Sequence, residues 1–229
     1  MKEPGFHLSQ LVNVSREGAI AWITLNRPAR RNALDDDLLV ALDGALAALR
    51  DDAGTRVVVL TGAAPVFSAG ADTRDPSDRF LRRFSRVLDA LEALEPPTIA
   101  MVNGHAVGAG WALALACDFR VAADDAQFWL PEADLGIALA VPLAVRFVRV
   151  VGPAWTKAIA MEARRYPARE AQALGLVHEV VEGPALAGRV RQRADALAGT
   201  PSGPLAEAKA RINLLARIGA PEIAPSPTT

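Results

Sequence analysis

Residues 98–118 read TIAMVNGHAVGAGWALALACD, and this stretch decides the fold. Its first part, 98–102, is almost continuously apolar, which is typical of a strand buried on both faces of a parallel sheet. A glycine-rich turn over 103–110 then leads into a second apolar run at 109–116, long enough for a short buried helix. The stretch therefore predicts a strand, a tight turn and a helix that packs into the core.

A unit of the same kind comes just before it. The apolar run 57–60 predicts another buried strand, and the segment 66–72, VFSAGAD, supplies a second glycine-containing turn. Apolar residues recur at helical spacing over 78–94, so a helix should connect the two strands. Two parallel strands joined through a helix indicate the α/β class with a mixed sheet.

The remaining segments extend this core on both sides. A hairpin is predicted over 11–25, and a helix should begin near Asp35, where three consecutive acids suit a helix N-terminus. A strand follows at 119–122. The C-terminal third reads as a short strand at 177–181 among five helices, at 141–150, 153–162, 168–174, 185–199 and 203–216. We therefore predict a core over 1–150, a helical region over 151–218 and a disordered tail over 219–229, which is rich in Pro, Ser and Thr.

Composition excludes several classes of protein. Hydrophobic residues make up 51% of the 229 residues, which excludes a largely disordered chain. The net charge of −1 argues against nucleic acid as a partner. The single cysteine, Cys117, and three scattered histidines make a disulfide or a metal site unexpected. No apolar run reaches 18 residues and no signal peptide is visible, so we expect a soluble cytoplasmic protein with no membrane partner.

The two glycine-containing turns allow a chemical interpretation. Glycine lets a backbone pass close to a ligand, and two N–H groups from neighbouring turns can stabilise one developing oxyanion. The simpler interpretation is that these glycines only satisfy turn geometry, and the pattern of residues alone leaves both open.

Five segments together resemble the enoyl-CoA hydratase/isomerase (crotonase) family. They are LNRPARRNAL (25–34), FSAGAD (67–72), NGHAVGAGWALALACD (103–118), AQFWLPEADLG (126–136) and REAQALGLV (169–177). Their order and spacing agree with the family over 11–215. The resemblance implies a crotonase-like ββα spiral core with C-terminal helices, usually assembled as a trimer or hexamer. It also implies acyl-CoA substrates and no metal or redox cofactor, because coenzyme A is part of the substrate.

The resemblance further implies roles for individual residues. The backbone N–H groups of Ala71 and Ala109 would form the oxyanion hole. Contacts to coenzyme A would come from Arg30, Arg31, Ser68, Ala69 and Asp72. The acyl pocket would include Trp111, Ala112 and Ala140.

Members of the family that catalyse different reactions differ in their acid–base residues. Typical hydratases carry two glutamates, and here the first position is Ala112 whereas the second is Glu132. A third position, which holds aspartate in other members, is Ala140. One retained glutamate is the pattern of Δ3,Δ2-enoyl-CoA isomerases, so the resemblance favours isomerisation with Glu132 as the catalytic residue. A hydratase with an atypical site and an inactive CoA-ester-binding protein are the alternatives.

Glu132 also stands out from its surroundings. Aromatic and apolar residues precede it at 128–130, and a further apolar stretch begins at Leu135. Apolar surroundings disfavour the ionised carboxylate and raise its pKa, which suits a group that takes up and returns a proton. The alternative is an ordinary solvated loop glutamate, and Asp134 is the next candidate base.

Overall fold

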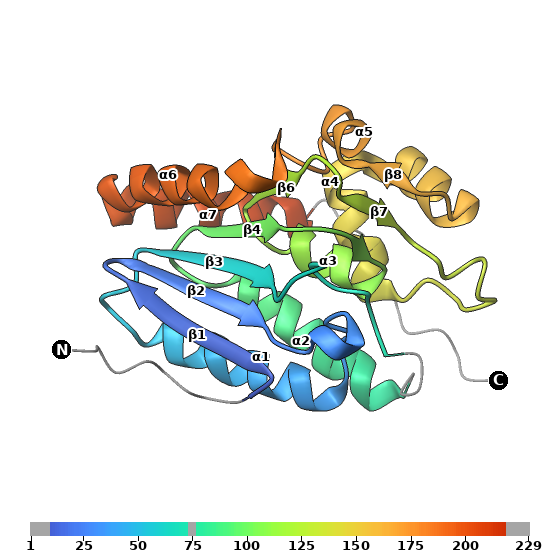
Figure 1. The fold of residues 1–229 in the computed structure, drawn as a ribbon, viewed down its shortest axis with the longest axis horizontal. Coiled ribbons are helices and arrows are strands. Elements are labelled where there is room, and N and C mark those ends of the chain that lie inside the picture. The colour runs from blue at the N-terminus through green and yellow to red at the C-terminus, as the bar shows by residue number, and fades with distance from the viewer. Residues whose placement is uncertain (1–9, 73–76, 219–229) are drawn as a thin grey trace.

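A six-stranded sheet forms the centre of the protein (Figure 1). The computed structural model describes residues 10–72 and 77–218. The strand order is β1-β2-β3-β4-β6-β9, in which β1 and β2 form an antiparallel hairpin and all other neighbours are parallel. The strands are β1 (Val12–Glu17), β2 (Ile20–Leu25), β3 (Val57–Gly62), β4 (Thr98–Val102), β6 (Phe119–Ala123) and β9 (Glu179–Val181).

Helices cover both faces of this sheet, which explains why its central strands are continuously apolar. Side chains alternate along a strand, so Val58 and Leu60 of β3 join the larger core cluster, while Val57 and Val59 join the smaller one. The larger cluster includes the apolar faces of two helices, α1 (Asp36–Arg50) and α2 (Asp78–Glu92). The smaller cluster is closed by α6 (Leu186–Gly199), which lies across the sheet from α1 and α2 (Figure 1).

The first two helices begin near the predicted positions, and each has a side-chain cap. The Asp35 carboxylate accepts a hydrogen bond from the N–H of Leu38, and the Ser77 hydroxyl oxygen accepts one from Phe80. Each cap satisfies one of the free N–H groups at a helix start.

The other helices follow the predicted order. They are α3 (Ala109–Leu115), α4 (Val141–Glu162), α5 (Ala168–Ala173) and α7 (Ser202–Ile218), with single 3₁₀ turns at Pro28–Arg30 and Gly183–Ala185. The two helices predicted at 141–150 and 153–162 are the two parts of α4, which are separated by a kink at Gly152, whose φ of 72° is not helical. Gly152 can adopt this conformation because it has no Cβ, so the chain bends there.

A second, small sheet was not predicted from the sequence. It contains β5 (Ala106–Val107), β7 (Gln127–Trp129) and β8 (Tyr166–Pro167), with β7 in the middle. Strands of two or three residues are too short to show a period, and β5 lies inside the stretch that was predicted as a turn. This sheet holds the second glycine-containing turn against the segment that leads to Glu132.

The α/β class is confirmed, and no helix in the described ranges is long and apolar enough to cross a membrane. The predicted boundary between residues 150 and 151 falls inside α4, and the division into a core and a helical region stays a prediction. The tail predicted over 219–229 lies outside the described residues.

Candidate active site

The two glycine-containing turns lie side by side and are joined by backbone hydrogen bonds. Ser68 pairs with Ala106 as an isolated bridge, and the N–H of Val107 donates to the carbonyl oxygen of Ser68 at 3.0 Å. In return, the N–H groups of Phe67 and Ser68 both donate to the carbonyl oxygen of His105. The turns that follow β3 and β4 are therefore one continuous piece of structure.

Glycine is required at two points of this contact. A Cβ on Gly110 would lie 2.7 Å from Cβ of Ser68, and a Cβ on Gly70 would lie 2.6 Å from the carbonyl oxygen of Val107. Gly70 also has a φ of 88°, which side chains rarely tolerate. The same added Cβ on Gly70 would be 3.5 Å from the backbone nitrogen of Ala109, so the two turns meet next to Ala71 and Ala109.

Neither of these two alanines uses its N–H within the described part of the chain. Leu34 and Ala71 lie opposite each other in an isolated parallel bridge. In this bridge the N–H of Leu34 donates to the carbonyl oxygen of Gly70, and the carbonyl oxygen of Leu34 accepts from the N–H of Asp72. The N–H of Ala71 therefore takes no part in the bridge. Ala109 is the first residue of α3, so no carbonyl earlier in that helix accepts from it. Two backbone donors that have no acceptor among the described residues thus lie close together, as an oxyanion hole requires.

A cavity of about 300 Å³ opens at this point. Its volume is at the lower end of the range for small-molecule sites. Predicted residues that line it are Ala69, Ala71, Asp72, Ala109, Glu132 and Ala140. The apolar part of the wall, which sequence reasoning did not assign to the site, comes mainly from Phe80, Leu81, Phe84, Leu135, Ile137 and Leu143. The helical spacing of Phe80 and Phe84 predicted a buried face but not which cavity it borders.

Glu132 is the half-buried carboxylate of this cavity. Its Oε2 atom is shielded from solvent and has no hydrogen-bond partner among the described residues. Its Oε1 atom would be 3.0 Å from a Cβ placed on Gly108, so the carboxylate lies against the second turn. Burial raises the pKa of Glu132 above its usual value of 4.5, as the apolar neighbours in the sequence predict.

Asp72, the other carboxylate of the cavity, is held by cations. Its Oδ2 atom is 3.7 Å from the guanidinium of Arg27 and 3.4 Å from that of Arg30. Arg30 and Arg31 are both exposed on the loop beside it. Asp72 therefore differs from Glu132, because its charge is balanced within the protein.

A residue that sequence reasoning missed, Asn32, holds this loop in place. Asn32 is completely buried with a φ of 53°, and its side-chain amide donates to the carbonyl oxygens of Ala63 and Val66. Its backbone carbonyl oxygen accepts from the Ser68 hydroxyl at 2.8 Å. Asparagine tolerates a left-handed backbone conformation better than most residues, and this tolerance is the only feature by which the sequence could have indicated the role of Asn32. Ser68 is thus buried and does not line the cavity, whereas Ala69 does.

Two residues predicted for the acyl pocket lie in the core instead of the cavity wall. Trp111 and Ala112 are completely buried, and neither lines the cavity beside Glu132. The Trp111 ring packs against Phe147 with centroids 4.7 Å apart, and also contacts Phe128 and Tyr166. Their role in the acyl pocket stays a prediction.

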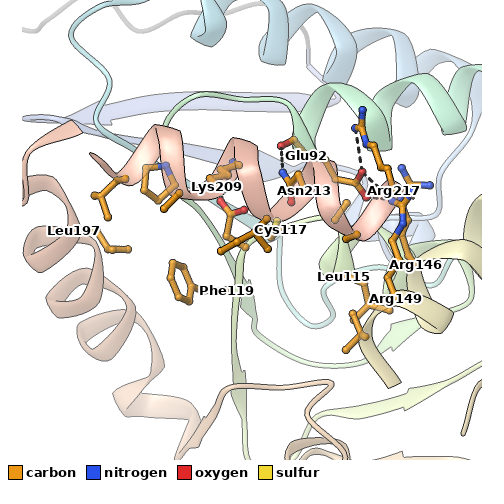
Figure 2. Close-up of a pocket in the computed structure, with 18 residues that line it drawn as sticks. Glu92, Leu115, Cys117, Phe119, Arg146, Arg149, Leu197, Lys209, Asn213 and Arg217 are labelled. Atoms are coloured by element: carbon orange, nitrogen blue, oxygen red, sulfur yellow. Dashed lines mark hydrogen bonds and ion pairs between the residues drawn. The ribbon is translucent and has the colours of Figure 1, made fainter. Parts of the chain in front are cut away.

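A larger cavity, of about 450 Å³, lies beneath α7 (Figure 2). Its charged side chains are paired: Glu92 with Arg146, Arg149 and Arg217, and Asp118 with Lys209. Burial raises the pKa of the Cys117 thiol to about 12, so this residue of the wall is not a nucleophile at neutral pH. This cavity shares no lining residue with the one beside Glu132. Its paired charges fit a packing contact between α7, α4 and the end of α2.

Comparisons with known proteins identify the family of this chain. A family model described as enoyl-CoA hydratase/isomerase matches residues 15–220. The 2,3-dehydroadipyl-CoA hydratase of Escherichia coli (strain K12) is 39% identical over 178 residues, which cover 76% of this chain and 69% of the relative. The carnitinyl-CoA dehydratase of Salmonella arizonae is 38% identical over 208 residues, covering 88% of this chain and 78% of that one.

Solved structures agree as well. An enoyl-CoA hydratase from Bacillus anthracis has a TM-score of 0.84 at 30% identity, covering 92% of this chain and 91% of that chain. A monofunctional enoyl-CoA isomerase from M. smegmatis has a TM-score of 0.81 at 32% identity, covering 93% and 97%. The family model, the relatives and the shared fold lead to one conclusion: this chain belongs to the enoyl-CoA hydratase/isomerase family and has its crotonase-like α/β fold.

Proposed function

We propose that this protein moves the double bond of an enoyl-CoA thioester from the 3-position to the 2-position. One observation carries the proposal: of the two carboxylates that line the cavity, Glu132 alone has a buried oxygen without a partner in the described residues, whereas Asp72 is held by Arg27 and Arg30. A 1,3-proton shift requires one base, whereas hydration usually employs two acid–base groups.

The reaction follows from the two turns and Glu132. The thioester oxygen accepts hydrogen bonds from the N–H groups of Ala71 and Ala109, which makes the protons on C2 more acidic. Glu132 removes one C2 proton, and the electron pair of that C–H bond delocalises into a dienolate whose negative charge rests on the thioester oxygen. Glu132 then returns the proton to C4, the C2–C3 double bond forms, and the thioester carbonyl is restored.

The chemistry of each participant is consistent with this cycle. A carboxylate whose pKa is raised by burial is a stronger base than an ordinary glutamate, so it takes up the C2 proton more readily, and its conjugate acid can still return the proton to the more basic dienolate. The substrate is neither oxidised nor reduced, so the reaction needs no redox partner, and the backbone N–H groups of Ala71 and Ala109 supply the stabilisation of the oxyanion that a metal ion would otherwise give. Coenzyme A enters as part of the substrate.

We assign contacts to the coenzyme A part of the substrate from the positions of residues near the cavity. Arg30 and Arg31 are exposed beside Asp72 at the cavity, where a guanidinium can pair with a phosphate. We assign the main chain at Ala69, which lines the cavity, to the adenine end, and Ala140 to the wall around the acyl chain. Ser68 takes no direct part in this assignment, because its N–H and its carbonyl oxygen are already bonded to His105 and Val107.

Hydration of 2-enoyl-CoA is the second candidate. It is favoured by the relatives, because the E. coli protein at 39% identity is named a hydratase and the Salmonella protein a dehydratase. In that case Glu132 alone would activate water, since Ala112 and Ala140 carry no acid–base group.

Parallel assays on a 3-enoyl-CoA and a 2-enoyl-CoA test the proposal. We expect the purified protein to convert the 3-enoyl-CoA without forming a 3-hydroxyacyl-CoA. Consumption of the 2-enoyl-CoA with formation of the hydroxy product would support the hydratase instead. Tight binding of both esters without turnover would support a CoA-ester-binding protein and overturn the proposal.

We also assign this chain to a homo-oligomer, a trimer or hexamer. Three apolar side chains of α7 are exposed, Ile212 by 64%, Leu214 by 59% and Leu215 by 68%, and apolar side chains gathered on one helix favour association. Light scattering should give a mass above that of one chain at micromolar concentration. A mass equal to one chain would contradict the assignment.

A further inference from the structure

Glu132 separates two cavities. Besides the cavity at the two turns, it lines a second one of about 300 Å³, and Ile137 also belongs to both walls. The second cavity, here called the distal cavity, lies between the loop after Glu132 and the part of α4 that follows Gly152. A substrate whose C2 and C4 atoms meet Glu132 would therefore have room beyond that carboxylate for the rest of its acyl chain.

The wall of the distal cavity is apolar with one charged exception besides Glu132. Ala133, Ile137, Leu139, Ala160 and Met161 supply the apolar surface. The hydroxyl of Thr156 donates to the carbonyl oxygen of Gly152 at 2.7 Å, so it is already engaged. The remaining lining residue is Lys157.

Lys157 differs from the other cations of the same helix. Arg146 pairs with Asp89 and Glu92, and Arg149 pairs with Glu92. Lys157 is exposed, and no carboxylate among the described residues lies within ion-pair distance of it. Within the described structure, an ammonium group is thus left without a counterion at the wall of an apolar cavity.

We propose that the distal cavity receives the far end of the acyl chain and that Lys157 pairs with a carboxylate at that end. The preferred substrates would then be enoyl-CoA esters of dicarboxylic acids. This inference rests on the proposed function, since it takes Glu132 as the point where the chain reacts. Apolar walls favour the methylene groups of the chain, whereas a terminal carboxylate would be disfavoured there without a cation.

The test compares two substrates of equal length. One is a six-carbon enoyl-CoA that ends in a methyl group, and the other is the six-carbon enoyl-CoA that ends in a carboxylate. We expect the wild type to show a higher kcat/KM for the carboxylate-ended substrate. Lys157→Met should lower the ratio of the two kcat/KM values by about three- to fivefold, because an exposed ion pair has a modest energy. Lys157→Arg should keep most of the ratio.

Two controls isolate the local charge. Arg50→Met removes one positive charge from an exposed position at the end of α1, and it should leave the ratio unchanged. Raising the salt concentration should lower the ratio for the wild type and not for Lys157→Met, because salt screens an exposed pair. A wild-type ratio that neither Lys157→Met nor salt alters would overturn the inference.

Binding of saturated analogues separates this inference from the proposed function. Adipyl-CoA and hexanoyl-CoA cannot undergo the double-bond shift, so calorimetry reports their affinity alone. Tighter binding of adipyl-CoA that is lost in Lys157→Met supports the distal site even if no enoyl-CoA is converted. Conversion of the methyl-ended enoyl-CoA, together with equal binding of the two analogues, would support the proposed function and refute the distal site.

Discussion

The cavity beside Glu132 and the cavity beneath α7 are both bordered by buried or half-buried carboxylates, yet these carboxylates have different partners. Glu92, beneath α7, is contacted by Arg146, Arg149 and Arg217. Glu132 has a shielded oxygen without a hydrogen-bond partner among the described residues. The two backbone N–H groups next to it, of Ala71 and Ala109, likewise lack a protein acceptor in the described part of the chain.

The difference indicates which cavity is built for packing and which for chemistry. A buried charge is costly unless it is paired, so a structural carboxylate is surrounded by cations, as Glu92 is. A carboxylate that must take up a proton is more useful when burial raises its pKa and no cation lowers it again. The larger cavity is therefore the less promising site, because volume alone says nothing about unpaired groups.

The largest expected effect is the loss of turnover in Glu132→Gln. Glutamine keeps the size of the side chain but cannot accept the C2 proton, so kcat should fall by about 10²- to 10⁴-fold. Affinity for the CoA ester should change little. Asp134→Asn is the matched control, because Asp134 is exposed, does not line the cavity and should not matter for turnover. Wild-type rates for Glu132→Gln on every enoyl-CoA would mean that the base lies elsewhere.

The next effect is on stability, beneath α7. The Arg146 side chain is only 4% exposed and pairs with Glu92 and Asp89. Arg146→Leu should lower the free energy of unfolding by about 2–3 kcal/mol, since Glu92 then keeps only the more exposed Arg149 and Arg217 as partners. Urea denaturation measures this change. Arg50→Leu, which breaks an exposed pair with Asp51, should change stability by about 0.5 kcal/mol or less. If Arg146→Leu instead lost turnover at unchanged stability, the contrast between the two cavities would fail.

A smaller effect is expected where the two turns touch. In Gly110→Ala, the new Cβ would lie 2.7 Å from Cβ of Ser68 and 2.8 Å from its carbonyl oxygen, so the turns must move apart. We expect a stability loss of about 2 kcal/mol together with a lower kcat, because Ala109 shifts relative to Ala71. Gly44→Ala on α1 is the control: its Cβ meets nothing within 4 Å and should raise stability by about 0.5–1 kcal/mol. A fully active Gly110→Ala would separate the turn contact from catalysis.

The smallest effect concerns the pH dependence of stability. The pKa of Glu132 is higher in the folded protein than in the unfolded chain, where it is about 4.5, so folding favours the protonated carboxyl. The free energy of unfolding therefore falls as the pH rises from about 4.5 through the pKa of the folded state. Glu132→Gln cannot lose a proton. It should therefore unfold at a slightly higher urea concentration than the wild type at pH 7, with the gap closing below pH 4.5. An equal gap at both pH values would show that proton release is not its cause.

The pH dependence of activity also depends on the ionisation of Glu132. Only the ionised carboxylate accepts a proton, so kcat/KM of the wild type should rise with pH through the raised pKa of Glu132 and then level off. A rise centred at or below 4.5 would contradict the effect of burial.

Local patterns in the sequence were sufficient for most elements of the fold. The hairpin over 11–25, the helix from Asp35 and the strands at 57–60 and 98–102 were predicted correctly, because each depends on periodicity, turn residues or a cap within a few positions. Glu132 was likewise singled out by its apolar neighbours in the chain, and the structure accounts for this, since burial raises its pKa.

Only the tertiary structure decided how distant segments meet. The contact of the 66–72 turn with the 103–110 turn depends on two-residue strands and on Asn32, whose interactions reach 31 and 34 positions along the chain. Nothing in the sequence distinguishes Lys157 from other lysines. It stands out only in the structure, because it has no ion-pair partner among the described residues and lines a cavity together with Glu132. Periodicity records which face of an element is buried, whereas the partners of a side chain depend on packing between segments that the sequence does not place side by side.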